Sequence, residues 1–314
     1  MLVFAFKRLV SVIPILLGIT VIAYFLTRTI PGDVVAVMLG TNADPEVAAQ
    51  LRRNLRLDQP IIVGYFDWLA ALLRGDLGES IRSGLPIGQD LMTRFGRTAQ
   101  LTLAAIVLAT ALSIPLGILA AVRRNRAADQ VISITALLGI SVPDFWLGTL
   151  LILFFALKLG WLPPAGYASP SEDPALFLKL LILPTITLAF QVMGILTRFT
   201  RGAMLEVLNQ DFVRTARAKG VAERAVLYRH ALRNALIPVI TVIGLNIGFL
   251  LSGTILVETI FGWPGVGSLA VTAINQRDYP VVQACVMLFA LTFTVVNLVV
   301  DLLYGVIDAR IRYS

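Results

Sequence analysis

Residues 99–122 read AQLTLAAIVLATALSIPLGILAAV, an apolar stretch that contains no charged side chain. A helix needs roughly 20 mostly apolar residues to cross about 30 Å of hydrocarbon. Five other stretches meet the same test: Leu9 to Arg28, Val131 to Leu157, Leu180 to Phe199, Ala235 to Val257 and Val281 to Ile307. None shows the two-residue alternation of a barrel strand, so the sequence predicts an all-α membrane protein with six transmembrane helices, counting Ala99 to Val122.

The composition supports a membrane protein. Of the 314 residues, 57% are hydrophobic and 14% are charged, and the mean hydropathy is +0.83. The net charge of +7 does not indicate a nucleic-acid partner, because the basic residues fall in short segments between apolar runs. The apolar run after Lys7 and Arg8 is too long for a typical signal-peptide core, so we expect an uncleaved first span.

The distribution of Lys and Arg predicts the orientation. Basic residues gather at positions 7–8, 123–126, 198–233 and 310–312, whereas the short loops of the other side hold only Lys158, Lys179 and Arg277. The positive-inside rule therefore puts both termini in the cytoplasm, with the chain in the inner (plasma) membrane.

The predicted spans divide the chain into three regions. These are the N-terminus with the first helix (1–30), an external segment (31–98) and a five-helix core (99–314) with a cytoplasmic loop at 200–234. In the external segment, Pro31-Gly-Asp33, Gly75-Asp76 and Gly84-Leu-Pro86 predict turns, and Asp44-Pro-Glu46 followed by Val47 to Leu57 predicts a capped helix. The segment is either an external lid or docking element, or a structured connector.

The cytoplasmic loop contains a second predicted helix, from Glu206 to Gly220. A glycine after a basic last turn is a typical helix stop. Apolar Val207, Phe212 and Val213 alternate with charged residues, giving an amphipathic element too short to span the membrane. The residues alone leave open whether this element lies on anionic lipid or in the groove of a partner protein.

The motif Asp211-Phe-Val-Arg-Thr-Ala-Arg-Ala-Lys-Gly220, continued by Tyr228 to Pro238, resembles the cytoplasmic signature of ABC importer permeases of the dipeptide, oligopeptide and nickel family. The resemblance covers nearly the whole chain, because further motifs occur in the family's order. These are Ile30-Pro-Gly-Asp33, Gly75-Asp-Leu-Gly78, Ser141-Val-Pro-Asp-Phe145, Val257 to Gly267, Arg277-Asp-Tyr-Pro280 and Asn297 to Tyr304.

The resemblance implies a type I ABC importer fold and a set of partners. These are a second homologous permease that forms a heterodimer with this chain, two cytoplasmic ATP-binding subunits, an external solute-binding protein and a peptide substrate. No Gly-x-x-x-x-Gly-Lys-Ser/Thr loop occurs in the sequence, so we expect this chain to bind no cofactor and to be no enzyme, with ATP and Mg used by the partner ATPases. The resemblance implies that the importer translocates di- and oligopeptides across the inner membrane, with nickel or glutathione as the alternative cargo. An ion-coupled secondary transporter is the alternative class, although no inverted repeat is visible.

The resemblance also assigns the loop that would dock on the ATPase. Its residues are Glu206, Asp211, Arg214, Thr215, Ala216, Lys219 and Gly220. The general importer signature has Glu-Ala-Ala where this chain has Arg214-Thr-Ala216, so no glutamate-specific contact is carried over.

Polar residues within or beside apolar runs are further candidates, because an uncompensated ionised group is costly there. Pro143, Asp144, Gln191 and Asn246 are candidates for the translocation pathway, with kink stabilisation or interhelical hydrogen bonding as the alternatives. Glu258, Trp263 and Gly265 are candidates for an external gate or a binding-protein contact, and interfacial anchoring is the alternative for Trp263.

Asp301 is interpreted as structural, paired with water or an arginine. Cys285 is expected to pack in the core, and no cluster predicts a metal site.

Overall fold

The computed structural model describes residues 2–26, 35, 44–54 and 59–307. These residues form helices, turns and one isolated bridge between Glu79 and Pro86. The helices are α1 (Leu2–Leu26), α3 (Pro45–Asn54), α4 (Ile61–Leu73), α5 (Ile87–Val122), α6 (Ala127–Ser141), α7 (Asp144–Leu151), the π-helical η1 (Ile152–Lys158), α8 (Pro174–Leu208), α9 (Asp211–Ala218), α10 (Glu223–Ala225), the π-helical η2 (Val226–Ala231), α11 (Leu232–Gly253), α12 (Ile255–Ile260), α13 (Val266–Gln276) and α14 (Tyr279–Ile307).

The six-helix prediction is confirmed with one correction. Helices α1, α5, α8 and α14, and α11 together with the segment that leads into it, are long and apolar enough to cross a membrane. The predicted third span, Val131 to Leu157, is instead a pair of helical segments, α6 and α7–η1, bent by 102°. Val142 is extended and Pro143 follows it, because a proline disfavours the helical conformation of the residue before it.

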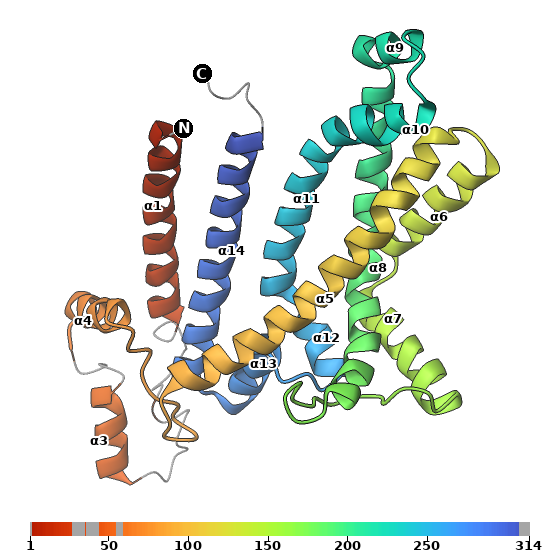
Figure 1. Cartoon of the computed structure of the whole chain (residues 1–314). Helices are drawn as coiled ribbons and strands as arrows, with labels where there is room; N and C mark the ends of the chain where they lie inside the picture. Colours follow the sequence, from red (N-terminus) through yellow and green to blue (C-terminus); the bar gives the residue numbers. More distant parts are fainter. Residues whose placement is uncertain (1, 27–34, 36–43, 55–58, 308–314) are drawn as a thin grey trace.

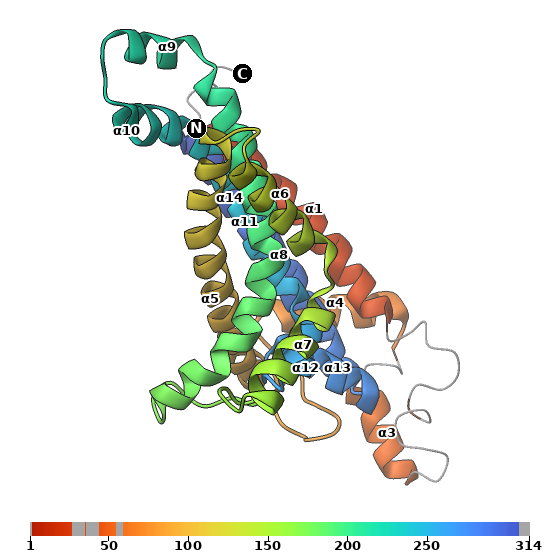
Figure 2. The same cartoon turned by 90° about the vertical axis from the view of Figure 1, so that its right-hand side faces the viewer.

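The two ends of the bundle are clearly different (Figure 1). The start of α1, the end of α14, and helices α9 and α10 lie at one end, whereas α3, α4, α7 and α13 lie at the other. The turned view in Figure 2 shows α9 and α10 projecting beyond the spanning helices. By the positive-inside prediction, the end with α9 is cytoplasmic and the opposite end is external.

Small residues let the spanning helices approach closely. A Cβ added at Gly194 of α8 would lie 2.5 Å from the Ala136 carbonyl oxygen of α6, and one added at Gly139 of α6 would lie 2.7 Å from the Phe190 carbonyl oxygen of α8. A Cβ at Gly117 of α5 would lie 2.6 Å from the Thr200 Cβ of α8. Helix α8 is therefore the element against which α5 and α6 pack, as expected where dispersion drives association.

The external segment is partly as predicted. The Asp44 carboxylate accepts a hydrogen bond from the Glu46 amide (2.9 Å) at the start of α3, which confirms the capped helix. Helix α5 begins at Ile87, so the predicted boundary between residues 98 and 99 falls inside a helix. Helix α4 lies beside α1, where the Thr20 and Tyr65 hydroxyl oxygens are 2.8 Å apart. The predicted turn at residues 31–33 lies outside the described residues.

Candidate functional site

The predicted cytoplasmic helix is two helices rather than one. Helix α8 continues to Leu208, and α9 starts at Asp211 after the turn at Asn209-Gln210. The Asn209 side-chain amide donates to the Leu205 carbonyl (2.9 Å), and Gln210 has an extended backbone. The correction follows from these two residues, because asparagine competes locally for backbone hydrogen bonds and so favours a helix end.

The predicted stop of this helix at Gly220 is confirmed. The Gly220 amide donates to the Arg217 carbonyl (3.0 Å), and the Val221 amide donates to the Ala216 carbonyl (3.2 Å). This pair of bonds is the Schellman motif, in which the glycine adopts a left-handed conformation, here with φ +75°. No heavy atom lies within 4 Å of a Cβ added at Gly220, so the glycine borders open space.

Helix α9 is fixed on one side and exposed on the other. The Val213 side chain is fully buried, whereas Asp211, Phe212, Arg214 and Lys219 are exposed. Arg217 donates to Glu223 of α10 (2.7 Å), and this hydrogen bond lowers the pKa of Glu223 and raises that of Arg217. The buried Val213 and the bond to α10 thus fix the orientation of α9, and its exposed face points away from the rest of the chain. Of the other predicted loop residues, Glu206 and Thr215 are exposed and Ala216 is half-buried.

An ion pair with a buried carboxylate, which the sequence did not reveal, lies close to this loop. The Arg201 guanidinium of α8 donates to both carboxylate oxygens of Asp129 in α6, at 2.6 and 2.8 Å. The Asn125 amide (2.9 Å) and the Ser133 hydroxyl (3.3 Å) complete the coordination of a carboxylate that is 4% exposed. The pair joins the cytoplasmic end of α6 to the helix that leads into α9.

At the external end, Glu258 of α12 is fully buried. Its carboxylate accepts hydrogen bonds from the Thr98 hydroxyl (2.7 Å), the Thr254 hydroxyl (2.8 Å) and the Ser268 amide (2.9 Å). Burial raises its pKa, and these hydrogen bonds oppose the shift. A Cβ at Gly265 would overlap this carboxylate, so the glycine leaves room for it. Glu258 therefore joins α5, α12 and α13.

Trp263 requires a correction. The interfacial-anchor interpretation is wrong, because the side chain is fully buried, its indole donates to the Arg97 carbonyl (3.0 Å) and its ring stands edge-on to Tyr167. Glu258 and Gly265 are buried as well, so none of the three offers a surface to a binding protein. Their role in an external gate stays a prediction.

The pathway candidates are not joined to one another by any hydrogen bond within the described residues. Pro143 and Asp144 lie at the break between α6 and α7, exposed and half-buried respectively. Gln191 of α8 is half-buried, and the buried Asn246 of α11 donates to the Val242 carbonyl of its own helix (2.7 Å). Their role in translocation stays a prediction.

Two other residues behave as the sequence predicts. The Asp301 carboxylate of α14 pairs with the Arg8 guanidinium of α1 at 3.0 Å, which confirms a structural ion pair. The Cys285 side chain is buried in the core, which confirms its predicted packing role.

Comparison with protein families decides the class of this chain. Residues 113–313 match a family described as binding-protein-dependent transport system inner membrane component, and residues 1–102 match the N-terminal family of such membrane components. The chain belongs to this family of ABC importer permeases. It is accordingly a multi-pass inner-membrane transport subunit, and the ion-coupled alternative is overturned.

Similarity to individual proteins supports the same family assignment. The chain is 44% identical to the glutathione transport system permease protein GsiC of Salmonella typhimurium and 43% identical to that of Escherichia coli K12, with 100% of each chain covered. Among solved structures, the inward-facing MetNI methionine ABC transporter matches with a TM-score of 0.58 at 15% identity, covering 69% of this chain and 96% of that one. This likeness confirms the permease fold. Importers of the family work with ATPase and solute-binding partners.

Proposed function

We propose that this permease passes small peptides across the inner membrane, with glutathione as the leading candidate substrate. The observation that carries the proposal is the full-length match, at 44% identity, to permeases named for glutathione transport. It favours the glutathione alternative over the di- and oligopeptide cargo that was the main sequence-based expectation. Nickel is less favoured, because the single histidine, His230, lies on the cytoplasmic side in η2, away from any external entry point.

The coupling step of the proposal rests on α9. Its exposed basic face would dock on one of two cytoplasmic ATP-binding subunits, and the second such subunit would serve a homologous permease partner. Closure of the ATPases would push on α9 and, through buried Val213 and the adjoining η2, on α11. The bundle would then alternate between outward and inward openings as a two-state switch that nucleotide biases.

The cargo step of the proposal involves the pathway candidates. Glutathione carries two amide groups and two carboxylates, so hydrogen-bonding side chains suit it better than an uninterrupted apolar wall. Gln191 and Asn246 are the amide side chains that we assign to this role, and Asp144 at the helix break is the ionisable one. An external solute-binding protein would deliver the substrate to them.

The experiment is uptake of labelled glutathione, a dipeptide and nickel in cells that carry this permease with its partner subunits. Gly220→Arg places a bulky side chain in a left-handed conformation on the face assigned to the ATPase. The matched control is Gly202→Arg, at an exposed α8 position that also borders open space but needs no special φ.

We expect glutathione uptake that Gly220→Arg abolishes and Gly202→Arg largely preserves, with both proteins inserted in the membrane. Wild-type uptake of nickel alone would change the assigned cargo and keep the coupling loop. Full glutathione uptake by Gly220→Arg would remove α9 from ATPase coupling.

A further inference from the structure

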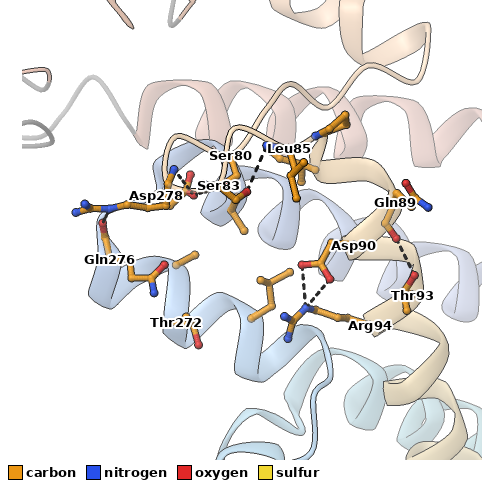
Figure 3. A pocket seen from close by; sticks show the side chains of 16 residues that line it. Ser80, Ser83, Leu85, Gln89, Asp90, Thr93, Arg94, Thr272, Gln276 and Asp278 are labelled. Atoms are coloured by element: carbon orange, nitrogen blue, oxygen red, sulfur yellow. Dashed lines mark hydrogen bonds and ion pairs between the residues drawn. The ribbon is translucent and has the colours of Figure 1, made fainter. Parts of the chain in front are cut away.

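A cavity of about 560 Å³ opens at the external end of the molecule (Figure 3). Its walls are formed by the loop at residues 80–86, the first turns of α5, the helix α13, and the junction of α13 with α14. The loop is held at the end of α13 by the buried Asp278 carboxylate, which follows that helix and accepts hydrogen bonds from the Ser80 hydroxyl (2.5 Å) and from the Ile81 and Arg82 amides (3.3 and 3.4 Å). The walls are therefore fixed relative to one another.

The side chains that line this cavity offer more hydrogen-bond donors than the protein uses. The Arg82 Nε donates to the Gln276 carbonyl (2.9 Å), and the Arg94 Nε donates to both oxygens of Asp90 (3.0 and 2.9 Å). A guanidinium has five N–H donors. Among the described residues only the Nε of each arginine makes a hydrogen bond, so the terminal nitrogens of both remain available. The side-chain amides of Gln89 and Gln276 also make no hydrogen bond there.

The charged side chains that line the cavity, Arg82, Arg94, Asp90 and Asp278, balance in number, but only Arg82 is both exposed and outside an ion pair. Asp278 is 3% exposed and enclosed by the loop, and Asp90 is already paired with Arg94. Arg82 is exposed and has no carboxylate partner in the described part of the chain. An incoming carboxylate would find free donors on both walls, with Asp90 as the exposed opposing charge and Asp278 enclosed beneath the loop.

The openness of the cavity favours a protein side chain over a free peptide. Sites for small ligands bury most of the ligand surface, whereas Arg82, Gln89, Asp90 and Gln276 all stand exposed at the rim here. We propose that this cavity receives an acidic side chain of the external solute-binding protein, with Arg82 as its anchor. The inference rests on the proposed function, because it presumes that such a protein delivers the substrate.

The test measures the binding-protein concentration that gives half-maximal stimulation of ATP hydrolysis by the complete importer in lipid nanodiscs at low salt. Arg82→Gln should raise this concentration about tenfold or more, because a hydrogen-bonded charge contact is lost. Arg82→Lys should restore part of the loss, and Asp90→Asn should lower the concentration by removing the opposing charge. The control Arg74→Gln removes an exposed arginine of the same external segment outside the cavity, and should change nothing.

A second measurement separates docking from a merely structural role of Arg82. The dependence of this concentration on ionic strength should become weaker in Arg82→Gln, which a loosened loop alone would not produce. An unchanged or lower half-maximal concentration in Arg82→Gln, or a higher one in Asp90→Asn, would overturn the inference while the proposed function stands. So would variants that alter only binding of free glutathione or only assembly with the second permease. A wild-type importer that no binding protein stimulates would overturn both.

Discussion

The Glu258 carboxylate shows how one residue can hold the external end together. Its donors come from α5, from the residue before α12 and from α13, and its side chain is fully buried. Buried donors that lose a charged acceptor pay their desolvation cost without a partner. The carboxylate is therefore a structural joint for any gate built from α12 and α13.

Glu258→Ala should destabilise the protein by about 3 kcal/mol, because it leaves the hydroxyl groups of Thr98 and Thr254 and the Ser268 amide unsatisfied. Thermal unfolding in detergent measures the loss as a lower Tm. Glu172→Ala, at an exposed glutamate of the same external side, should leave Tm unchanged. Equal Tm values for the two variants would show that the three donors find other partners.

The pair of Asp129 and Arg201 should behave as a coupled unit. Asp129→Asn and Arg201→Gln should each destabilise the protein, and the double variant should lose about 2 kcal/mol less than the sum, because the second substitution removes a charge already left unpaired. Chemical denaturation of the four proteins gives this coupling free energy. Additive effects would mean that the pair contributes no more than its separate parts.

Single residues show which parts of the site the sequence could reveal. The sequence indicates Glu258, because an ionisable group beside an apolar run demands compensation. Its partner Thr98 lies 160 positions earlier, and Arg201 lies 72 positions from Asp129, so no local pattern could join them. The isolated acid at Asp129, within a basic loop that precedes an apolar run, was the one available indication of a buried pair.

Among the elements, the contact between α6 and α8 depends on two glycines that face each other's backbones. Gly194→Ala should push α6 away and destabilise the protein by about 1–3 kcal/mol, as overpacking does. Gly202→Ala lies in the same helix with open space around it and should be neutral or slightly stabilising, since alanine has the better helix propensity. Circular dichroism during heating measures both, and an equal response would contradict the close approach.

Hydropathy predicted where the helices cross the membrane, but not where they end. Helix α5 starts at Ile87 and α8 extends to Leu208. In each case the helix continues through turns rich in polar residues, which a hydropathy window excludes from the predicted span. The break in the third span was readable in principle from Pro143, although its angle depends on the packing of α7 against the neighbouring helices. The division of the loop into α8 and α9 was likewise hidden, because Asn209 and Gln210 interrupt an otherwise helical pattern only locally.

For the whole molecule, the orientation can be tested through its cysteine content. The single cysteine, Cys285, is buried, so the native chain should not react with a membrane-impermeant maleimide. Glu172→Cys and Ala222→Cys place exposed thiols at the external and cytoplasmic ends. Intact cells should label only Glu172→Cys, and permeabilised cells should label both. The reverse pattern would invert the topology.

The length of α8, a continuous helix that contains Pro184, has a mechanical consequence. Its 35 residues amount to a rod of roughly 52 Å, so a tilt of about 5° around one end carries the other end through about 4.5 Å, close to the rise of one helical turn. Because α9 follows one end of α8 and the external loops adjoin the other, the proposed docking of an ATPase on α9 would let a slight tilt of α8 move the external end by several ångströms. The chain would then gate by leverage, without any helix having to unwind.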